Sequence, residues 1–382
     1  SSAIKNELGQ LVEKDVWQAV HKWNLTYEEV KKIIRSSMFL KQKYKADGSF
    51  EKWKARLVAG CNTQSDEELL KIYDTLSSPT VSHSSVMIML AIAAIEERDI
   101  ATVDITGAYL ECPLPDNDVV IMETNKELTQ LLCEVDQTVS EFVDSRSGKC
   151  YLRLKKALYG CIQSSMLWYD RLRTALESIG FVVNPYDNCL FNRGSGKYQV
   201  SVGFHVDDLL ITGRLKSKVD EAIELLRPKF KAITVTRGDK HSYLGMNICV
   251  LKDRITVDMS GYEEQLLEGY APKKAQRPAE ANLFDDDDTL ELLVNSDRES
   301  LHSRVCKLLY LAKRTRLDIL TAVSHLASRV KKPNAQDKRK LDQVYDYLAT
   351  TKGSALQLMK GNRTAMCAYI DASYAPHEGA YS

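Results

Sequence analysis

The segment YQVSVGFHVDDLLIT, residues 198–212, gives the clearest indication of the fold. Its two apolar runs, 198–204 and 209–212, flank a short connection that ends in Asp207 and Asp208. Apolar runs rich in β-branched and aromatic residues that are joined by so few residues are typical of a β-hairpin. We therefore predict a hairpin with two carboxylates at its tip.

A third carboxylate, Asp104, follows the strand-like residues 101–103 and precedes Asp207 by 103 residues. Carboxylates on separate strands can converge on cations that prefer oxygen ligands, as two-metal phosphoryl transfer requires. A solvated turn and an ordinary strand end explain the same residues. Spacing alone favours this structural interpretation, so the choice depends on the rest of the sequence.

Outside these segments, helical and strand-like periodicities alternate without a repeat. Ser82 is a candidate N-cap, and Gly180 suits the end of a helix that begins at Ser164. Beyond Lys252 the periodicity becomes helical, except near the end of the chain. We expect helices over 86–95, 164–179, 219–230, 262–270, 305–312, 319–330 and 341–348, strands over 100–105, 243–250 and 365–373, and a polar, loop-rich insert over 113–149.

The composition is that of an ordinary globular protein. Of the 382 residues, 44% are hydrophobic and 27% charged, and the longest apolar run, 86–95, is too short to span a bilayer. The nine cysteines are scattered, without the spacing of a zinc site. These features predict a soluble, intracellular protein with reduced thiols in its core and no membrane partner.

The charges are balanced in number but uneven in distribution. The chain has 52 basic and 52 acidic residues, yet the segment 280–300 contains eight acids and one base, so the remainder carries a net charge of +7. This distribution permits binding to nucleic acid without requiring it. We expect the aspartate run Asp285 to Asp288 to form a solvated loop.

Seven motifs occur along the chain in a fixed order, and together they are more specific than any one of them. They are KARLVAG (54–60), VDITGAYL (103–110), LKKALYG (154–160), VDDLL (206–210), YLGM (243–246), LLYL (308–311) and YIDA (369–372). In this order the sequence resembles the reverse transcriptases of copia-type LTR retrotransposons. The resemblance extends over most of the chain.

The resemblance implies an α+β fold of the right-hand polymerase type. The palm would be an antiparallel sheet with helices on one face. The implied regions are fingers over 1–98 with the 113–149 insert, palm over 99–250, a helical thumb over 251–352, and a linker with the opening strand of a truncated RNase H domain over 353–382.

The resemblance also assigns roles to single residues. Asp104, Asp207 and Asp208 match catalytic carboxylates that bind two Mg²⁺ ions, for which Mn²⁺ can substitute. The matched substrate-binding residues are Lys54 and Arg56 at the triphosphate, Tyr109 under the sugar, and Tyr159, Gly160 and Gln163 beside the nascent base pair, with Lys240 as a candidate general acid.

The implied activity is RNA-directed and DNA-directed DNA synthesis, in which dNTPs extend a primer annealed to an RNA or DNA template. Such an enzyme replicates a retroelement in a cytoplasmic particle or in the nucleus. The sequence leaves a monomer and a homodimer equally open. It also leaves a structural interpretation open for Tyr109 as a packed aromatic, and for Lys54 and Arg56 as a solvated basic strand.

Four positions depart from the usual family pattern: Ile162, Ser165, His205 and Leu317. None of them is one of the three carboxylates. The main alternative function is a reverse-transcriptase-like module that binds nucleic acid but has lost catalysis. Because loss of catalysis usually damages the acidic triad, three intact acids favour the polymerase.

Overall fold

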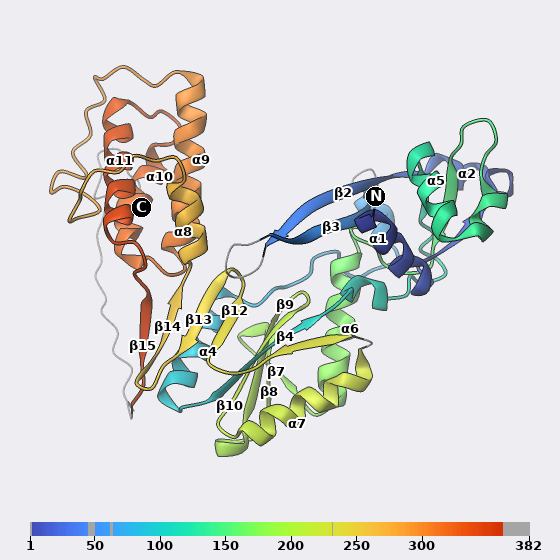
Figure 1. Ribbon diagram of the computed structural model, residues 1–382, viewed down its shortest axis with the longest axis horizontal. Coiled ribbons are helices and arrows are strands. Elements are labelled where there is room, and N and C mark those ends of the chain that lie inside the picture. The colour runs from blue at the N-terminus through green and yellow to red at the C-terminus, as the bar shows by residue number, and fades with distance from the viewer. Residues whose placement is uncertain (1, 45–49, 62–63, 231, 362–382) are drawn as a thin grey trace. The chain divides into compact units, whose positions relative to one another are not determined.

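The computed structural model describes residues 2–44, 50–61, 64–230 and 232–361. It is a mixed helix-and-sheet structure with largely antiparallel sheets, as the sequence predicted (Figure 1). Contacts divide the chain into two compact units. The first contains residues 1–82, 103–211 and 216–235, and the second contains residues 83–102, 212–215 and the chain from 236 onward.

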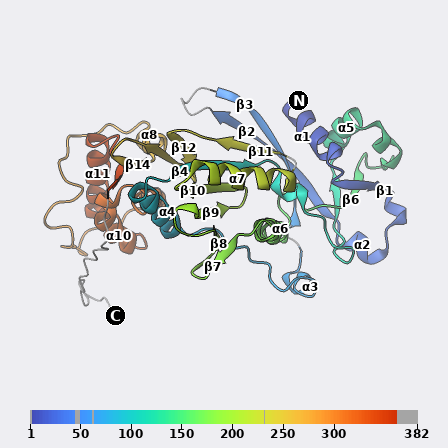
Figure 2. The same ribbon diagram turned by 90° about the horizontal axis from the view of Figure 1, so that it is seen from below.

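One sheet of the first unit has the strand order β1-β6-β5-β2-β3. Its two long strands, β2 and β3, form a hairpin whose antiparallel pairing can be followed in Figure 2. Helix α1 packs on β3 and on α5, over a core that includes Leu8, Leu57 and Leu152. The elements are α1 Ser2–Glu13, β1 Trp17–Val20, α2 Tyr27–Lys31, β2 Ile34–Tyr44, β3 Phe50–Ala59, α3 Asp66–Leu69, β5 Ile121–Thr124, α5 Lys126–Val135 and β6 Cys150–Leu154.

A six-stranded sheet has the order β11-β4-β10-β9-β8-β7. Its strands β9 and β10 form the predicted hairpin and are buried along nearly their whole length, because helices α6 and α7 pack nearby through apolar faces. The elements are β4 Asp99–Ile105, α6 Ser164–Ser178, β7 Val182–Asn184, β8 Asp187–Arg193, β9 Val200–His205, β10 Asp208–Gly213, α7 Lys216–Leu226 and β11 Ile233–Thr236.

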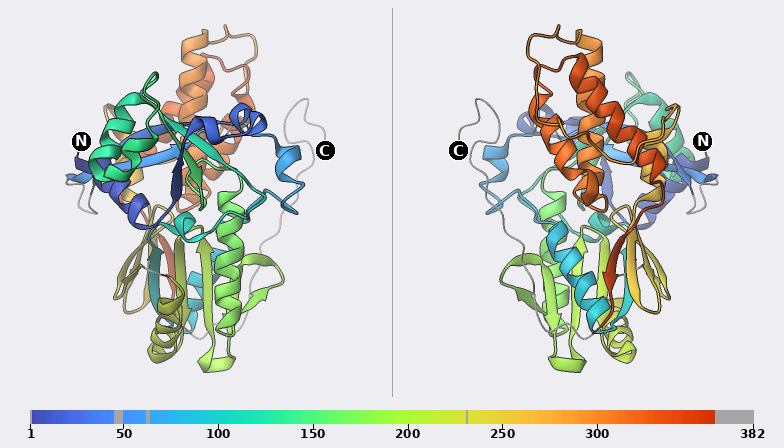
Figure 3. Two further views of the ribbon diagram at one scale, coloured as in Figure 1. Left: turned by 90° about the vertical axis from the view of Figure 1, so that its right-hand side faces the viewer. Right: turned by 90° about the vertical axis from the view of Figure 1, so that its left-hand side faces the viewer.

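The second unit combines a four-stranded antiparallel sheet, of order β12-β13-β14-β15, with five helices among the residues described. Helix α4 contacts β14 and β15. The helices α8 to α11, orange to red in Figure 3, gather into a bundle. The elements are α4 His83–Ile95, β12 Lys240–Tyr243, β13 Met246–Val250, β14 Arg254–Asp258, α8 Ser260–Leu267, α9 Asn295–Ala312, α10 Leu320–Arg329, α11 Ala335–Thr350 and β15 Leu356–Met359.

Three expectations about local structure were wrong. The 113–149 insert is not mainly loop, because it contains β5 and α5. The segment 243–250 is not one strand: Leu244 and Gly245, with φ of +51° and +77°, form a two-residue turn between β12 and β13. Leucine rarely adopts this left-handed conformation, and Gly245 alone did not indicate a turn within an otherwise strand-like segment. The region beyond Lys252 is not purely helical, since β14 and β15 lie in it.

The strand expected over 365–373, and with it the motif at 369–372, lies outside the described residues. Within the ranges that are described, no helix is long and apolar enough to cross a membrane.

The acidic run Asp285 to Asp288 forms an exposed loop, as expected, and it is also attached to two helices. The carboxylate of Asp286 lies 2.7 Å from Nζ of Lys340 on α11 and 3.2 Å from Nε2 of His325 on α10. Asp288 pairs with Arg329 at 2.6 Å. The partners are distant in the sequence, so local patterns could not indicate them.

Asp286→Ala is expected to lower the free energy of unfolding by about 1–3 kcal/mol, because it removes the carboxylate that Lys340, His325 and Arg329 share. Burial opposes ionisation, but the hydrogen bond from Lys340 and the charges of His325 and Arg329 lower the pKa of Asp286. A group with a depressed pKa stabilises the fold at neutral pH, and this contribution is lost as the pH falls through the folded-state value.

Urea denaturation between neutral and acidic pH measures both effects. Asp285→Ala is the matched control, because Gln336 and Lys340 contact Asp285 through its backbone carbonyl, which the substitution keeps. Equal stabilities of the two variants at neutral pH would contradict the structural role of Asp286.

Candidate active site

The tip of the β9–β10 hairpin is held in an unusual conformation. Its two turn residues are Val206 and Asp207, and Val206 has a φ of +56°. A β-branched residue is strained in this region, and such strain persists only where the surroundings impose it. Here the indole Nε1 of Trp168, on α6, donates a hydrogen bond to the Val206 carbonyl at 2.8 Å. The packing of α6 therefore helps to fix the position of Asp207.

Strand β4 brings Asp104 to the same tip. The backbone N–H of Ile105 donates to the Asp207 carbonyl at 3.0 Å, so the end of β4 runs alongside the turn. Asp104, one residue earlier, is exposed, and its carboxylate accepts a hydrogen bond from Thr106. The structure therefore joins three acids that come from two distant segments of the sequence.

The pKa shifts of Asp207 and Asp208 reflect electrostatic repulsion among the three carboxylates. Burial raises the pKa of Asp208 to about 6, and the negative charges of Asp207 and Asp104 contribute to this rise, while His205 opposes it. Burial also raises the pKa of Asp207, and Asp104 again adds to the shift. Clustered, partly buried carboxylates of this kind repel one another, so a bound divalent cation would relieve the repulsion.

The donor set fits Mg²⁺, which prefers carboxylate oxygens. Within the described ranges, however, no three acidic, histidine or cysteine side chains are already arranged as metal ligands.

Two cations of β3 face this cluster. Lys54 and Arg56 alternate along the strand and so share one face of the hairpin. Both lower the pKa of Asp207 through their charges, which places them near the carboxylates. The guanidinium of Arg56 also lies over the ring of Tyr159, 4.2 Å from its centroid, in a cation–π contact.

Tyr109 and Tyr159 form an aromatic pair beside the acids. Tyr109 lies in a 3-10 turn, Ala108–Glu111, that directly follows β4. Its ring centroid is 5.2 Å from that of Tyr159. Burial, and then the charge of Asp207, raise the pKa of Tyr109. The tyrosine is half-buried, so part of its ring remains available for contact.

Gly160 is required by a close approach of two backbones. It has a φ of +92°, and a Cβ placed there would lie only 2.1 Å from the carbonyl oxygen of Ala59. The N–H of Ala59 donates to the carbonyl of Tyr159 at 2.8 Å. The loop that carries Tyr159 is thereby packed against the end of β3.

One residue of the sequence-based set, Gln163, is hydrogen-bonded to a different acid. Gln163 is completely buried, and its Nε2 donates to the carboxylate of Asp118 at 2.7 Å. The hydroxyl of Tyr73 donates to the same oxygen at 2.5 Å. The buried hydrogen bond to Asp118 thus gives Gln163 a structural role. Lys240 is exposed on β12 of the second unit, and its role stays a prediction.

Sequence reasoning missed that Trp168 supports the turn at Asp207, and that Tyr73 and Asp118 form a buried hydrogen-bonded group with Gln163. Asp118 lies in the insert that was expected to be loop, and nothing in its neighbourhood marks it as the acceptor of two buried donors. Trp168 lies in the segment 164–179, which was predicted to be a helix, and no role at the site was assigned to it. No local pattern indicates that its N–H reaches Val206.

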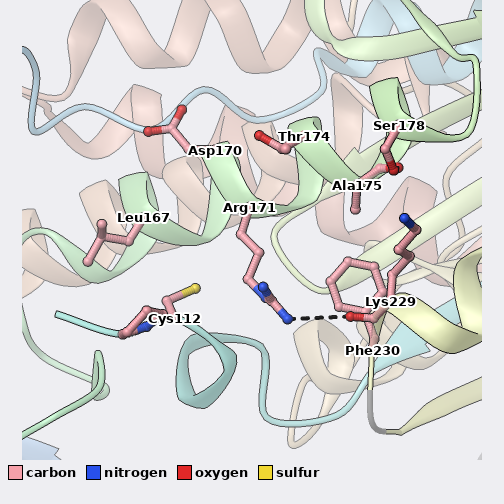
Figure 4. Close-up of a pocket in the computed structure, with 10 residues that line it drawn as sticks. Cys112, Leu167, Asp170, Arg171, Thr174, Ala175, Ser178, Lys229 and Phe230 are labelled. Carbon is pink, nitrogen blue, oxygen red and sulfur yellow. Dashed lines mark hydrogen bonds between the residues drawn. The ribbon is translucent and has the colours of Figure 1, made fainter. Parts of the chain in front are cut away.

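A separate cavity of about 480 Å³ lies beside α6 and contains none of the proposed site residues (Figure 4). Arg171 spans it and donates to the carbonyl of Lys229 at 3.4 Å. Its other lining residues are mainly apolar.

Comparison with known proteins identifies the family of this chain. The sequence model of the family described as reverse transcriptase (RNA-dependent DNA polymerase) matches residues 15–276. The chain therefore belongs to the reverse transcriptase family, and its resemblance to the copia-type retrotransposon enzymes is confirmed.

Three similar proteins come from transposons. The retrovirus-related Pol polyproteins from transposons RE1 and RE2 of Arabidopsis thaliana are 28% and 27% identical, over 91% and 90% of this chain and 22% of each relative. The truncated transposon Ty1-A Gag-Pol polyprotein of Saccharomyces cerevisiae is 24% identical, over 97% of this chain and 30% of the relative. The chain thus spans less than a third of the length of these relatives.

Among solved structures, a telomerase from Candida albicans, in complex with a fragment of telomeric RNA, aligns with a TM-score of 0.35 and 10% identity. The alignment covers 89% of this chain and 62% of the telomerase chain.

Proposed function

We propose that this chain is an RNA-directed and DNA-directed DNA polymerase that extends the 3′ end of a primer with dNTPs. The observation that carries the proposal is the meeting of Asp104 with Asp207 and Asp208 at one sheet end, facing Lys54 and Arg56. Acids opposite cations suit a reaction that moves a polyanionic triphosphate toward bound metal ions.

In the proposed mechanism, Asp104, Asp207 and Asp208 would hold two Mg²⁺ ions, or Mn²⁺ in their place. When bound, the ions would lower the pKa of the primer hydroxyl and stabilise charge on the α-phosphate and the leaving pyrophosphate. Lys54 and Arg56 bind the triphosphate by charge-assisted hydrogen bonds. Tyr109 and Tyr159 line the space for the incoming sugar and base, and Lys240 remains a proposed proton donor.

We assign the regions of the right hand accordingly. The fingers would comprise 1–98 with 113–149, the palm 99–250, and the thumb 251–352. The hairpin of β2 and β3 and the bundle α8 to α11 support the fingers and the thumb respectively. Residues 353–382 would link to an RNase H domain, and most of them lie outside the described residues.

The direct test is extension of an annealed DNA primer on RNA and on DNA templates, with and without Mg²⁺. Mg²⁺-dependent extension on both templates is the expected result. The alternative, a binding module without catalysis, would bind the template and primer but yield no product. The intact acidic triad is the observation that opposes it.

Tyr109→Val is expected to raise ribonucleotide incorporation relative to deoxyribonucleotide incorporation by at least about tenfold, since the ring would no longer exclude a 2′-hydroxyl. Single-nucleotide incorporation assays with matched dNTP and rNTP measure this ratio. Tyr109→Phe is the control, because it keeps the ring and should keep the discrimination. An unchanged ratio in the valine variant would assign Tyr109 to packing alone.

A further inference from the structure

Two buried cysteines from distant parts of the sequence lie side by side in the first unit. Cys61 follows the end of β3, and Cys161 follows Gly160. The thiol of Cys61 donates a hydrogen bond to Sγ of Cys161, with the sulfurs 3.2 Å apart. A disulfide bond is about 2.05 Å long, so an approach of little more than about 1 Å would join them.

The pair connects two segments of the proposed active site. Strand β3 carries Arg56, and the loop before Cys161 carries Tyr159, whose ring lies under that guanidinium. The hydrogen bond from the Ala59 N–H to the Tyr159 carbonyl already joins the two segments next to the cysteines. A disulfide would add a covalent link at the same junction.

The two sulfurs are unequal in reactivity. The hydrogen bond from Cys61 lowers the pKa of Cys161, although burial opposes this, and the same bond together with burial raises the pKa of Cys61. Cys161 is 6% exposed and Cys61 is 0% exposed, so Cys161 is the more accessible sulfur. The thiolate is the nucleophile in oxidation. A small oxidant is thus expected to react first at Cys161.

Other buried cysteines provide a contrast. Burial is the main reason that the pKa values of Cys112, Cys150 and Cys189 rise to about 12. Their thiols are therefore poor nucleophiles at neutral pH.

We propose that Cys61 and Cys161 form a reversible thiol–disulfide pair, and that its oxidation by a peroxide cross-links β3 to the 157–163 loop and inhibits nucleotide addition. The Cys161 thiolate attacks hydrogen peroxide, the O–O bond breaks, and a sulfenic acid forms with hydroxide, which takes up a proton to become water. The sulfur of Cys61 then displaces the second oxygen, which leaves as water with the thiol proton. In total, two thiols and one peroxide give one disulfide and two waters.

The inhibitory part of the proposal rests on the proposed polymerase function. Closing the sulfur gap shifts Tyr159 relative to Arg56 by up to about 1 Å, and displacements of that size can reduce catalysis up to about a hundredfold. We expect oxidation to reduce kcat/KM for dNTP by at least about tenfold. Reduction by dithiothreitol should restore it.

Peptide mapping tests the cross-link without any need for activity. Trypsin releases Cys61 in the peptide 57–71 and Cys161 in the peptide 157–171, and each peptide contains one cysteine. After peroxide treatment and blocking of free thiols, mass spectrometry of the unreduced digest should detect the two peptides joined. The joined species should disappear with dithiothreitol and in Cys61→Ser or Cys161→Ser, and persist in Cys306→Ser, which removes an exposed thiol. Absence of the joined species from the oxidised wild type would overturn the proposal.

Primer extension tests the inhibition. The oxidised wild type should be inhibited and the peroxide-treated Cys61→Ser variant should not, while both extend primers when reduced. A cross-link without loss of primer extension would overturn the proposed inhibition of nucleotide addition. Absence of extension by the reduced wild type would instead refute the proposed polymerase function, and the mapping result would stand independently. If Cys161→Ser does not fold, Cys61→Ser alone provides the comparison.

Discussion

Asp207→Asn is expected to reduce primer extension by more than about a hundredfold, because loss of one preorganised charge at the reacting centre costs about that much in other enzymes. Asp104→Asn should have an effect of the same order. The two acids come from adjoining strand ends and share one electrostatic environment, so neither can replace the charge of the other. Asp208→Asn should also reduce extension, by an amount that depends on whether it contacts both ions.

Quantitative extension under single-turnover conditions measures the loss, and a binding assay with labelled template and primer shows that duplex affinity is retained. Asp170→Asn is the matched control, because burial also raises the pKa of this carboxyl, yet Asp170 lines the separate cavity beside α6. Retention of a tenth of wild-type extension by Asp207→Asn would show that the assigned triad is wrong.

Arg316→Met is expected to lower the free energy of unfolding by about 3–5 kcal/mol, the usual cost of leaving one partner of a buried ion pair alone. Arg316 is 1% exposed and pairs with Glu263, 2% exposed, at 2.9 Å. It also donates to Asp318 at 2.8 Å and to Thr351 at 2.6 Å. The guanidinium thus joins α8, the end of α11 and the turn before α10.

Urea denaturation provides the measurement, and Arg304→Met provides the control. Arg304 pairs with Asp342 at 3.2 Å in a partly exposed position, where an ion pair contributes about 1 kcal/mol or less. The double variant Arg316→Met with Glu263→Met should recover part of the stability, because no unpaired carboxylate remains at position 263. Equal losses for Arg316→Met and Arg304→Met would refute the buried network as a main source of stability.

Much of the local structure follows from the sequence. The β9–β10 hairpin was predicted because two apolar, strand-like runs that are joined by so few residues usually pair with each other. The helices α4, α6 and α10 were predicted because their apolar residues recur at helical spacing and capping or stop residues flank them. The order of the motifs predicted the family, which the match over residues 15–276 confirms.

Expectations about local structure failed where a residue adopts a backbone conformation that its residue type rarely adopts. Leu244 turns the chain between β12 and β13 with a positive φ, and the surrounding structure imposes it against local preference. The aspartate run is exposed, as its charge predicted, but its attachment to two helices was not predicted. The cations that hold Asp286 and Asp288 belong to helices that fold against the loop only in the tertiary structure.

For the proposed site, the sequence by itself determined which side chains are available: three acids, two cations on alternate positions of one strand, and the aromatic and glycine residues of two motifs. Only the tertiary structure decided which of them meet. It places Asp104 beside Asp207 and packs Gly160 on Ala59, while it turns Gln163 to Asp118 and joins Cys61 to Cys161. Pairings between residues about 40 to 100 positions apart leave no periodicity in the sequence, because strand register and long-range packing, rather than local preference, bring them together.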